Sequence, residues 1–144
     1  MDYIRKINYY ETDKMGITHH SNYVRFMEEA RIDFLKQIGC DYGKWENDGI
    51  ISPVIGIECE YKRPTTFGDE IRIRVEIAEY KRLKLTVLYT MFNIATNDIV
   101  FEGKSHHCFV NEQGRPLALS KHYPEYDEIL KKQLIEKSSP KENT

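Results

Sequence analysis

The stretch YYETDKMGITHHSNYVRFMEEARIDFL, residues 9–35, joins a short polar loop directly to a strongly amphipathic segment. Across residues 22–38 the apolar side chains recur at helical spacing, and charged side chains fill the opposite side. The spacing predicts a helix with one face to bury, with Ser21 or Asn22 as its N-cap and Gly39 as the glycine that ends it. The rest of the domain must supply an apolar surface that covers this face.

An acidic residue and two histidines lie just upstream of this helix. Asp13 comes first, and His19 and His20 immediately precede the cap. The N–H groups of a first helical turn can hold a developing negative oxygen while a nearby carboxylate attacks a carbonyl carbon or activates water. The pattern predicts such a site, although an aspartate shortly before Gly16 is also ordinary turn chemistry.

Five further segments have patterns typical of strands. We expect strands at residues 2–9, 54–62, 70–77, 84–94 and 99–110. The segment 84–94 carries apolar residues on both faces, so it should lie in the centre of a sheet that is covered on both sides.

The remaining segments are expected to be loops and a second helix. Residues 10–21 and 111–120 are interpreted as loops, and residues 42–47 as a short irregular or helical piece. Pro124 is a favoured first helical residue. The apolar side of the helix that it starts is formed by Tyr126, Ile129, Leu130, Leu134 and Ile135.

This order of elements predicts an α+β domain in which an antiparallel sheet wraps the one long helix. We expect a single domain over residues 1–137, followed by a polar tail at 138–144. One early helix cannot cover a sheet with apolar residues on both faces. The chain is therefore predicted to form a homodimer or a larger symmetric oligomer.

The composition argues against several classes of protein. A chain of 144 residues with a formal net charge of -2 has no basic surplus with which to neutralise nucleic-acid phosphates. No signal peptide and no apolar run long enough to span a membrane is visible, which favours a cytoplasmic protein without a membrane partner.

The cysteines and the later histidine pair do not indicate a metal site or a disulfide framework. Cys40, Cys59 and Cys108 are an odd number at wide spacing, so they are interpreted as reduced thiols. His106 and His107 fall in a predicted strand, where adjacent side chains point to opposite faces and cannot jointly bind one metal ion. We expect no metal and no cofactor.

Four motifs give the chain a resemblance to a known family. They are Y-x-x-T-D-x-M-G at residues 9–16, H-x-N-Y at 20–23, E-x-A-R at 28–31 and Y-x-R-P-x-x-x-G-D at 61–69. In this order and spacing the chain resembles the hotdog-fold acyl-CoA thioesterases, specifically the 4-hydroxybenzoyl-CoA thioesterase family and its YbgC-like branch.

The resemblance implies a fold, an assembly and a set of site residues. It implies a five-stranded antiparallel sheet around the long helix, and a dimer that commonly doubles to a homotetramer. The catalytic triplet of the YbgC-like branch matches Tyr9, Asp13 and His20, with Asp13 as the essential carboxylate. The backbone N–H at the position of His20 is implied to point at the thioester carbonyl, and Tyr9 to position Asp13 or simply to pack.

A CoA substrate also needs cationic partners for its phosphates. Lys81, Arg82 and Lys84 are the candidates, although charge is expected on a solvated hairpin in any case. Arg63 is a further candidate. This chain departs from the family pattern here, because Lys81-Arg82-Leu83-Lys84 stands where family members often carry a serine after basic residues.

The sequence thus predicts a thioester hydrolase that converts an acyl-CoA to free acid and CoA, with Asp13 as nucleophile or general base. Two alternatives stay open: hydrolysis of acyl-carrier-protein thioesters, and a non-catalytic module that binds acyl-CoA. A hotdog dehydratase is not favoured, because the long helix lacks the paired histidine and carboxylate that such an enzyme needs.

Overall fold

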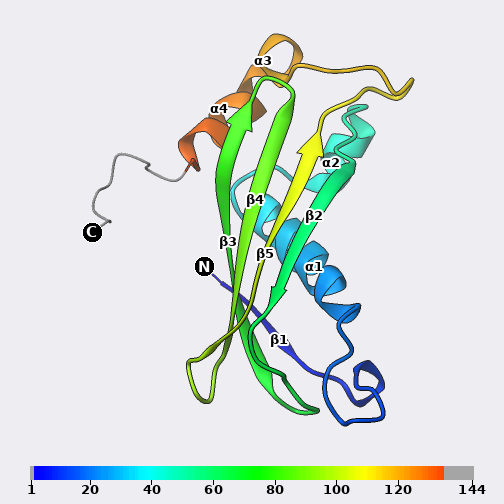
Figure 1. Cartoon of the computed structure of the whole chain (residues 1–144). Helices are drawn as coiled ribbons and strands as arrows, with labels where there is room; N and C mark the ends of the chain where they lie inside the picture. Colours follow the sequence, from blue (N-terminus) through cyan, green and yellow to red (C-terminus); the bar gives the residue numbers. More distant parts are fainter. Residues whose placement is uncertain (1, 135–144) are drawn as a thin grey trace.

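One long helix, α1 (Asn22–Gln37), runs along the concave side of a five-stranded antiparallel sheet in the computed structural model, which describes residues 2–134 (Figure 1). The order of strands across the sheet is β1-β3-β4-β5-β2. The strands are β1 (Tyr3–Lys6), β2 (Val54–Tyr61), β3 (Glu70–Lys81), β4 (Lys84–Asn93) and β5 (Ile99–Cys108). The shorter helices are the 3-10 helix η1 (Tyr9–Glu11), α2 (Tyr42–Asn47), α3 (Leu119–His122) and α4 (Pro124–Lys132). The predicted α+β class, with the sheet wrapped around one long helix, is confirmed.

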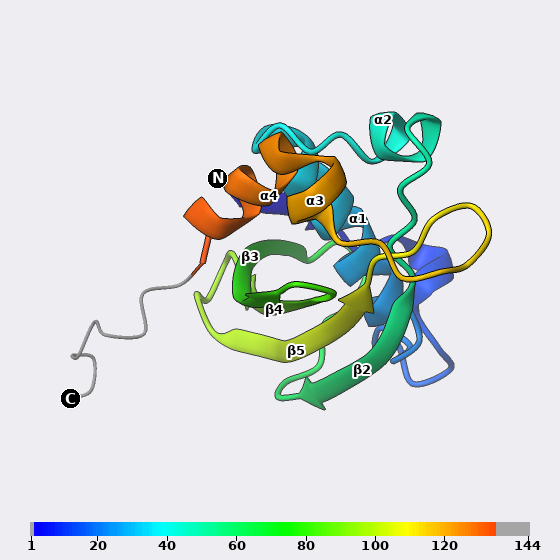
Figure 2. The same ribbon diagram turned by 90° about the horizontal axis from the view of Figure 1, so that it is seen from above.

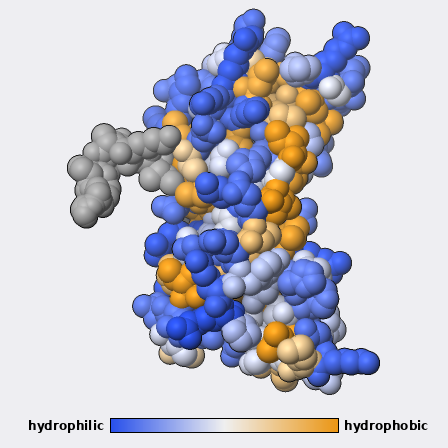
Figure 3. All heavy atoms as spheres, in the orientation of Figure 1, coloured by the Kyte–Doolittle hydropathy of each residue, from blue (hydrophilic) through white to orange (hydrophobic). Residues whose placement is uncertain are grey.

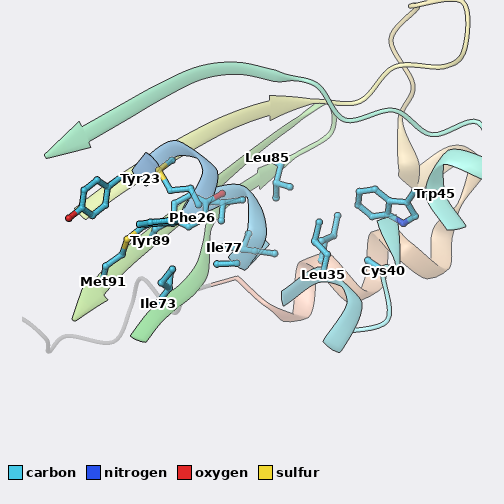
Figure 4. Close-up of a cluster of buried hydrophobic side chains, with 14 of the residues drawn as sticks. Tyr23, Phe26, Leu35, Cys40, Trp45, Ile73, Ile77, Leu85, Tyr89 and Met91 are labelled. Atoms are coloured by element: carbon cyan, nitrogen blue, oxygen red, sulfur yellow. The ribbon is translucent and has the colours of Figure 1, made fainter. Parts of the chain in front are cut away.

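The predicted apolar stripe of α1 is the face that the sheet covers. Its buried apolar residues are Tyr23, Phe26, Met27, Ala30 and Leu35. Figure 4 shows Tyr23 and Phe26 beside Tyr89 and Met91 of β4, within a single core cluster. Burial of a large apolar side chain contributes roughly 1.5 to 3 kcal/mol. Packing against the sheet therefore fixes the position of α1 and, with it, of the loop that precedes it.

Strand β4 lies in the middle of the sheet, as predicted, but it is not covered on both sides within the described chain. The helices lie on the concave face of the sheet (Figure 2). On the other face, the guanidinium groups of Arg72 and Arg74 lie 4.3 and 5.0 Å from the ring centroid of Phe92. These long side chains shield an apolar residue without a second layer of structure.

The first strand is shorter than the predicted range 2–9. It ends at Lys6, and residues Tyr9–Glu11 turn into η1. Glu11 causes this change of direction, because its buried carboxylate accepts hydrogen bonds from the backbone N–H of Asn8 at 2.8 Å and from Arg5 at 2.6 Å. The residues that precede the acidic loop are therefore held by a buried charge pair rather than by a strand.

Other differences from the predicted elements lie where strands end. Strand β3 continues past residue 77 to Lys81 through an irregularity between Ile77 and Glu79. Strand β5 ends at Cys108, two residues early, and the loop expected at 111–120 contains the start of α3. Helix α4 begins at Pro124 as predicted. Ile135, the end of the expected domain at residue 137 and the expected tail lie outside the described residues.

Candidate active site

A cavity of about 350 Å³ lies where the loop before α1 meets the segment after β2. The loop and α1 contribute Asp13, Ile17, Thr18, His20 and Tyr23, and the end of β2 with the segment that follows it contributes Tyr61, Lys62, Arg63 and Pro64. Three of the four motifs found in the sequence therefore share one cavity, although the motif at 61–69 is far from the other two along the chain. Its size suits a small organic group.

Asp13 is held in place by the turn that it forms. Its carboxylate accepts a hydrogen bond from the backbone N–H of Met15 at 2.8 Å, and its own N–H donates to the carbonyl of Ile17 at 2.9 Å. Gly16 completes the turn with a φ of 82°, a backbone conformation that favours glycine. Asp13 is thus a turn residue and a cavity residue at once.

The backbone at His20 leaves a donor unused. The N–H groups of Asn22 and Tyr23 donate to the carbonyls of His19 and His20, so the start of α1 is already satisfied. The N–H of Ser21 donates to the His19 ring at 3.2 Å. Within residues 2–134 no acceptor is found for the N–H of His20. This N–H belongs to a residue that lines the cavity, and it is therefore available to a ligand oxygen.

A cluster of buried hydroxyl groups ties the loop to its surroundings. Thr65 Oγ1 lies 2.6 Å from Thr18 Oγ1 and 2.8 Å from the hydroxyl of Tyr23. The carbonyl of Thr65 accepts a further hydrogen bond from the N–H of Thr18 at 2.8 Å. One threonine thus joins the acidic loop, α1 and the segment after β2. Sequence reasoning missed Thr18 and Thr65, because no spacing rule links residues that are 47 positions apart.

Aromatic rings form one wall of the cavity. The ring centroids of Tyr23 and Tyr61 lie 5.5 Å apart, and the ring of Phe101 stacks on Tyr23 at 5.0 Å. The Tyr61 hydroxyl donates to the carbonyl of His20 at 3.4 Å. Burial, followed by the neighbouring Cys59, raises the pKa of Tyr61 to about 12, so this hydroxyl keeps its proton at neutral pH.

The predicted residue Tyr9 lies outside the cavity. It sits in η1 with 75% of its surface exposed, and its ring meets the ring of Phe67 edge-on at 5.7 Å. Within the described chain its side chain makes no hydrogen bond to Asp13. The structure therefore brings Asp13 and His20 together and leaves Tyr9 on the adjoining surface.

The basic residues Lys81, Arg82 and Lys84 lie at the other end of the sheet. Lys84 pairs with Cys108 at one end of β5, whereas Tyr61 of the cavity pairs with Phe101 near the other end. At a rise of about 3.3 Å per residue, the two ends are roughly 23 Å apart. Within one chain this group does not line the cavity.

Two other cations line the cavity instead. Lys62 lies 3.5 Å from Glu60 and 3.6 Å from Glu102, whereas Arg63 is exposed and has no ion-pair partner among the described residues. The Y-x-R-P motif therefore contributes positive charge to the cavity that Asp13 also lines, and Arg63 is the freer of the two side chains.

No three His, Cys, Asp or Glu side chains of residues 2–134 are arranged to hold a metal ion. No helix in the same range has the length and apolar content needed to cross a membrane.

Comparisons with known proteins find extensive similarity. A model of the thioesterase-like superfamily matches residues 7–137. A candidate esterase of Aquifex aeolicus is 36% identical over 90% of this chain and 96% of its own length. A candidate acyl-CoA thioesterase of Bacillus subtilis, YneP, is 32% identical over 88% and 92% of the two chains. The crystal structure of a DHNA-CoA thioesterase from Staphylococcus aureus superimposes with a TM-score of 0.87 at 28% identity, covering 91% of this chain and 88% of that one.

Proposed function

Because the chain belongs to the thioesterase-like superfamily, we propose that it hydrolyses acyl-CoA thioesters to the free acid and CoA in the cavity beside Asp13. As a member of this superfamily, the chain is a thioester hydrolase. The observation that carries the proposal for the site is the meeting, at one cavity, of the Asp13 carboxylate and the unused N–H of His20.

The two groups suit the two demands of thioester hydrolysis. The N–H of His20 stabilises the negative charge that develops on the carbonyl oxygen, a contribution of roughly 3 to 4 kcal/mol for such a donor. The Asp13 carboxylate either attacks the carbonyl carbon and expels the CoA thiolate, giving a mixed anhydride that water then cleaves, or it removes a proton from the water that attacks directly. Both routes end in a carboxylic acid and a thiol, and neither requires a cofactor.

The other predicted residues take supporting roles in this proposal. Tyr9 supports the loop through its ring contact with Phe67. Arg63 neutralises charge at the mouth of the cavity. Lys81, Arg82 and Lys84 are retained as contacts for the phosphate end of CoA, which lies far from the thioester in an extended molecule. We assign the reaction to the cytoplasm, where acyl-CoA is available.

We further propose that the chain forms a homodimer through β2, and that two dimers form a homotetramer. Strand β2 is an edge of the sheet, and Val54, Ile55, Ile57 and Tyr61 are exposed along it. Figure 3 shows hydrophobic side chains gathered along this edge. A long apolar edge strand favours pairing with another strand, and a second copy supplies an identical one.

The proposed reaction is tested by measuring thiol release from short, long and aromatic acyl-CoAs by the wild type and by Asp13→Asn. An asparagine side-chain oxygen can still accept the Met15 hydrogen bond, so the turn is kept and the carboxylate is lost. We expect a fall in kcat of about 10²-fold or more. Asp69→Asn is the matched control, because Asp69 accepts a similar hydrogen bond from the N–H of Thr66 at 2.8 Å and does not line the cavity. If the wild type releases thiol from none of the acyl-CoAs, the proposal is refuted.

His20→Ala separates the backbone role of His20 from a role of its ring. The variant keeps the N–H, so we expect a loss clearly smaller than the roughly 10²-fold that removal of an oxyanion donor costs. A loss equal to that of Asp13→Asn would show instead that the imidazole takes part.

A further inference from the structure

The aromatic wall of the cavity is supported from behind by a ring that touches no cavity surface itself. Phe101 is fully buried and lies parallel to Tyr23, with 5.0 Å between ring centroids and 9° between ring planes. It also meets Tyr61 at an angle of 67°, with a centroid distance of 5.4 Å. Phe101 therefore sets the position of both tyrosines that face the cavity.

The position of Phe101 depends on the absence of a side chain two residues further along β5. A Cβ atom added at Gly103 would lie 2.7 Å from Cε1 and 3.0 Å from Cζ of the Phe101 ring, and 3.0 Å from the carbonyl oxygen of Glu58 on β2. Carbon atoms that are not bonded to each other pack at about 3.5 to 4.0 Å. No residue other than glycine is compatible with this placement of the ring.

A thioester bound with its carbonyl beside His20 directs one substituent toward this wall. The part of the CoA arm next to the thioester carries polar amide groups, which suit the exposed side chains of Lys62 and Arg63. The acyl group is the apolar substituent, and aromatic rings are suited to contact it. Because interiors are close-packed, a shift of the Phe101 ring is transmitted to Tyr23 and Tyr61.

We propose that Phe101 and Gly103 set the size of the acyl group that the cavity accepts, acting as positioning residues through Tyr23 and Tyr61. This inference rests on the proposed function and deepens it. The methyl group of Gly103→Ala pushes the Phe101 ring toward the tyrosines and narrows the cavity. Phe101→Leu removes the ring and lets the tyrosines move back, which enlarges it.

The test compares kcat/KM for a small and a large acyl-CoA in each variant. Gly103→Ala is expected to lower the large-to-small ratio of kcat/KM by about tenfold, since a change of one methylene in a pocket has an effect of that order. Phe101→Leu is expected to raise the ratio, and Phe101→Leu combined with Gly103→Ala to bring it back toward the wild type. A ratio is unaffected by partial unfolding, which lowers both values equally.

Gly56→Ala is the matched control. It adds the same methyl group to the neighbouring strand β2, where the nearest side-chain atom, on His106, would lie 3.4 Å away. The large-to-small ratio should not change in this variant.

Binding of S-alkyl-CoA thioethers of two chain lengths, measured by calorimetry, repeats the comparison without hydrolysis. We expect Gly103→Ala to weaken binding of the longer thioether selectively. The inference is overturned if the large-to-small ratio of kcat/KM and the long-to-short ratio of thioether affinity both stay at wild-type values in Gly103→Ala and Phe101→Leu. It is also overturned if the variants lower kcat/KM equally for all substrates. If thioether binding depends on size as expected but no acyl-CoA is hydrolysed, the proposed reaction fails and the size-setting role stands.

Discussion

Asp13 forms a turn and lines the cavity at the same time. Its carboxylate accepts a hydrogen bond from the N–H of Met15 and lines the cavity as well. The turn fixes the direction of the side chain before any substrate binds, and such preorganisation is what makes a nucleophile or base effective. The two interpretations of Asp13 that the sequence left open are therefore compatible.

A chain of hydrogen bonds connects Arg31 of α1 to the buried ring of His107. Arg31 donates to the Tyr89 hydroxyl at 3.1 Å, Tyr89 lies 2.6 Å from Ser105 Oγ, and Ser105 Oγ lies 2.7 Å from His107 Nε2. Arginine can only donate. The Tyr89 oxygen therefore accepts from Arg31, whereas either hydroxyl can be the donor between Tyr89 and Ser105, and the tautomer of the His107 ring sets the direction of the last hydrogen bond.

The buried ring of His107 predicts that the folding stability depends on pH. Burial, and then the charge of Arg31, lower the pKa of His107 from 6.5 to about 4. Between these values the unfolded chain binds a proton that the folded chain does not, so stability falls as the pH decreases through this range. Between about pH 7.5 and about pH 5 the free energy of unfolding should fall by about 2 kcal/mol.

Urea unfolding of the wild type and of His107→Gln over this pH range provides the measurement. Glutamine can accept the Ser105 hydrogen bond but does not titrate, so the variant should show a flatter dependence. An equal slope in both proteins would contradict the assignment to His107.

At the scale of elements, the site depends on one junction between a loop, a helix and the segment after β2. Thr65→Val removes the hydroxyl that Thr18 and Tyr23 share and leaves these buried groups with fewer partners. We expect a loss of about 1 to 3 kcal/mol in the free energy of unfolding. Thr65→Ser keeps the hydroxyl and is the matched control for urea unfolding. Equal free energies of unfolding of the valine and serine variants would show that the Thr65 hydroxyl does not contribute to stability.

The sequence predicts the regular elements well because each has a local cause. The apolar stripe of α1, the alternation in β2 and β3, and the apolar content of both faces of β4 depend on neighbouring residues alone. The helix η1 was missed because the apolar spacing of the first strand outweighed the pairing of Asn8 with Glu11. The four residues of α3 are too few to show a helical period.

The site was predicted only in part, for a physical reason. Asp13 and His20 are close in the sequence, and a local motif therefore identifies both. Thr65 and Phe101 reach the site through long-range packing, which no local pattern encodes. The distance between the cavity and Lys84 depends on the length and direction of β5, which becomes visible only in the folded sheet.

For the whole molecule, the two edges of the sheet should behave differently. Ile57 on the edge strand β2 is 41% exposed, and Ile4 on the opposite edge strand β1 is 58% exposed. Ile57→Lys places a charge in the proposed dimer interface and should convert the dimer to a monomer, because burial of an unpaired charge is costly. Ile4→Lys should leave the assembly unchanged. The molar mass, measured by light scattering after size-exclusion chromatography, distinguishes the dimer from the monomer. A dimer that persists in Ile57→Lys would show that β2 does not form the interface.

The strand order has a consequence for synthesis of the chain on the ribosome. Among the strands of residues 2–134, β2 is hydrogen-bonded only to β5, which is made about 40 residues later at roughly 5 to 20 residues per second. Until β5 emerges, Tyr61 has no strand to hold it, and the wall of the cavity is missing although Asp13 was translated long before. A nascent chain can therefore contain the loop that carries Asp13 early, but the cavity is complete only after β5 has been synthesised.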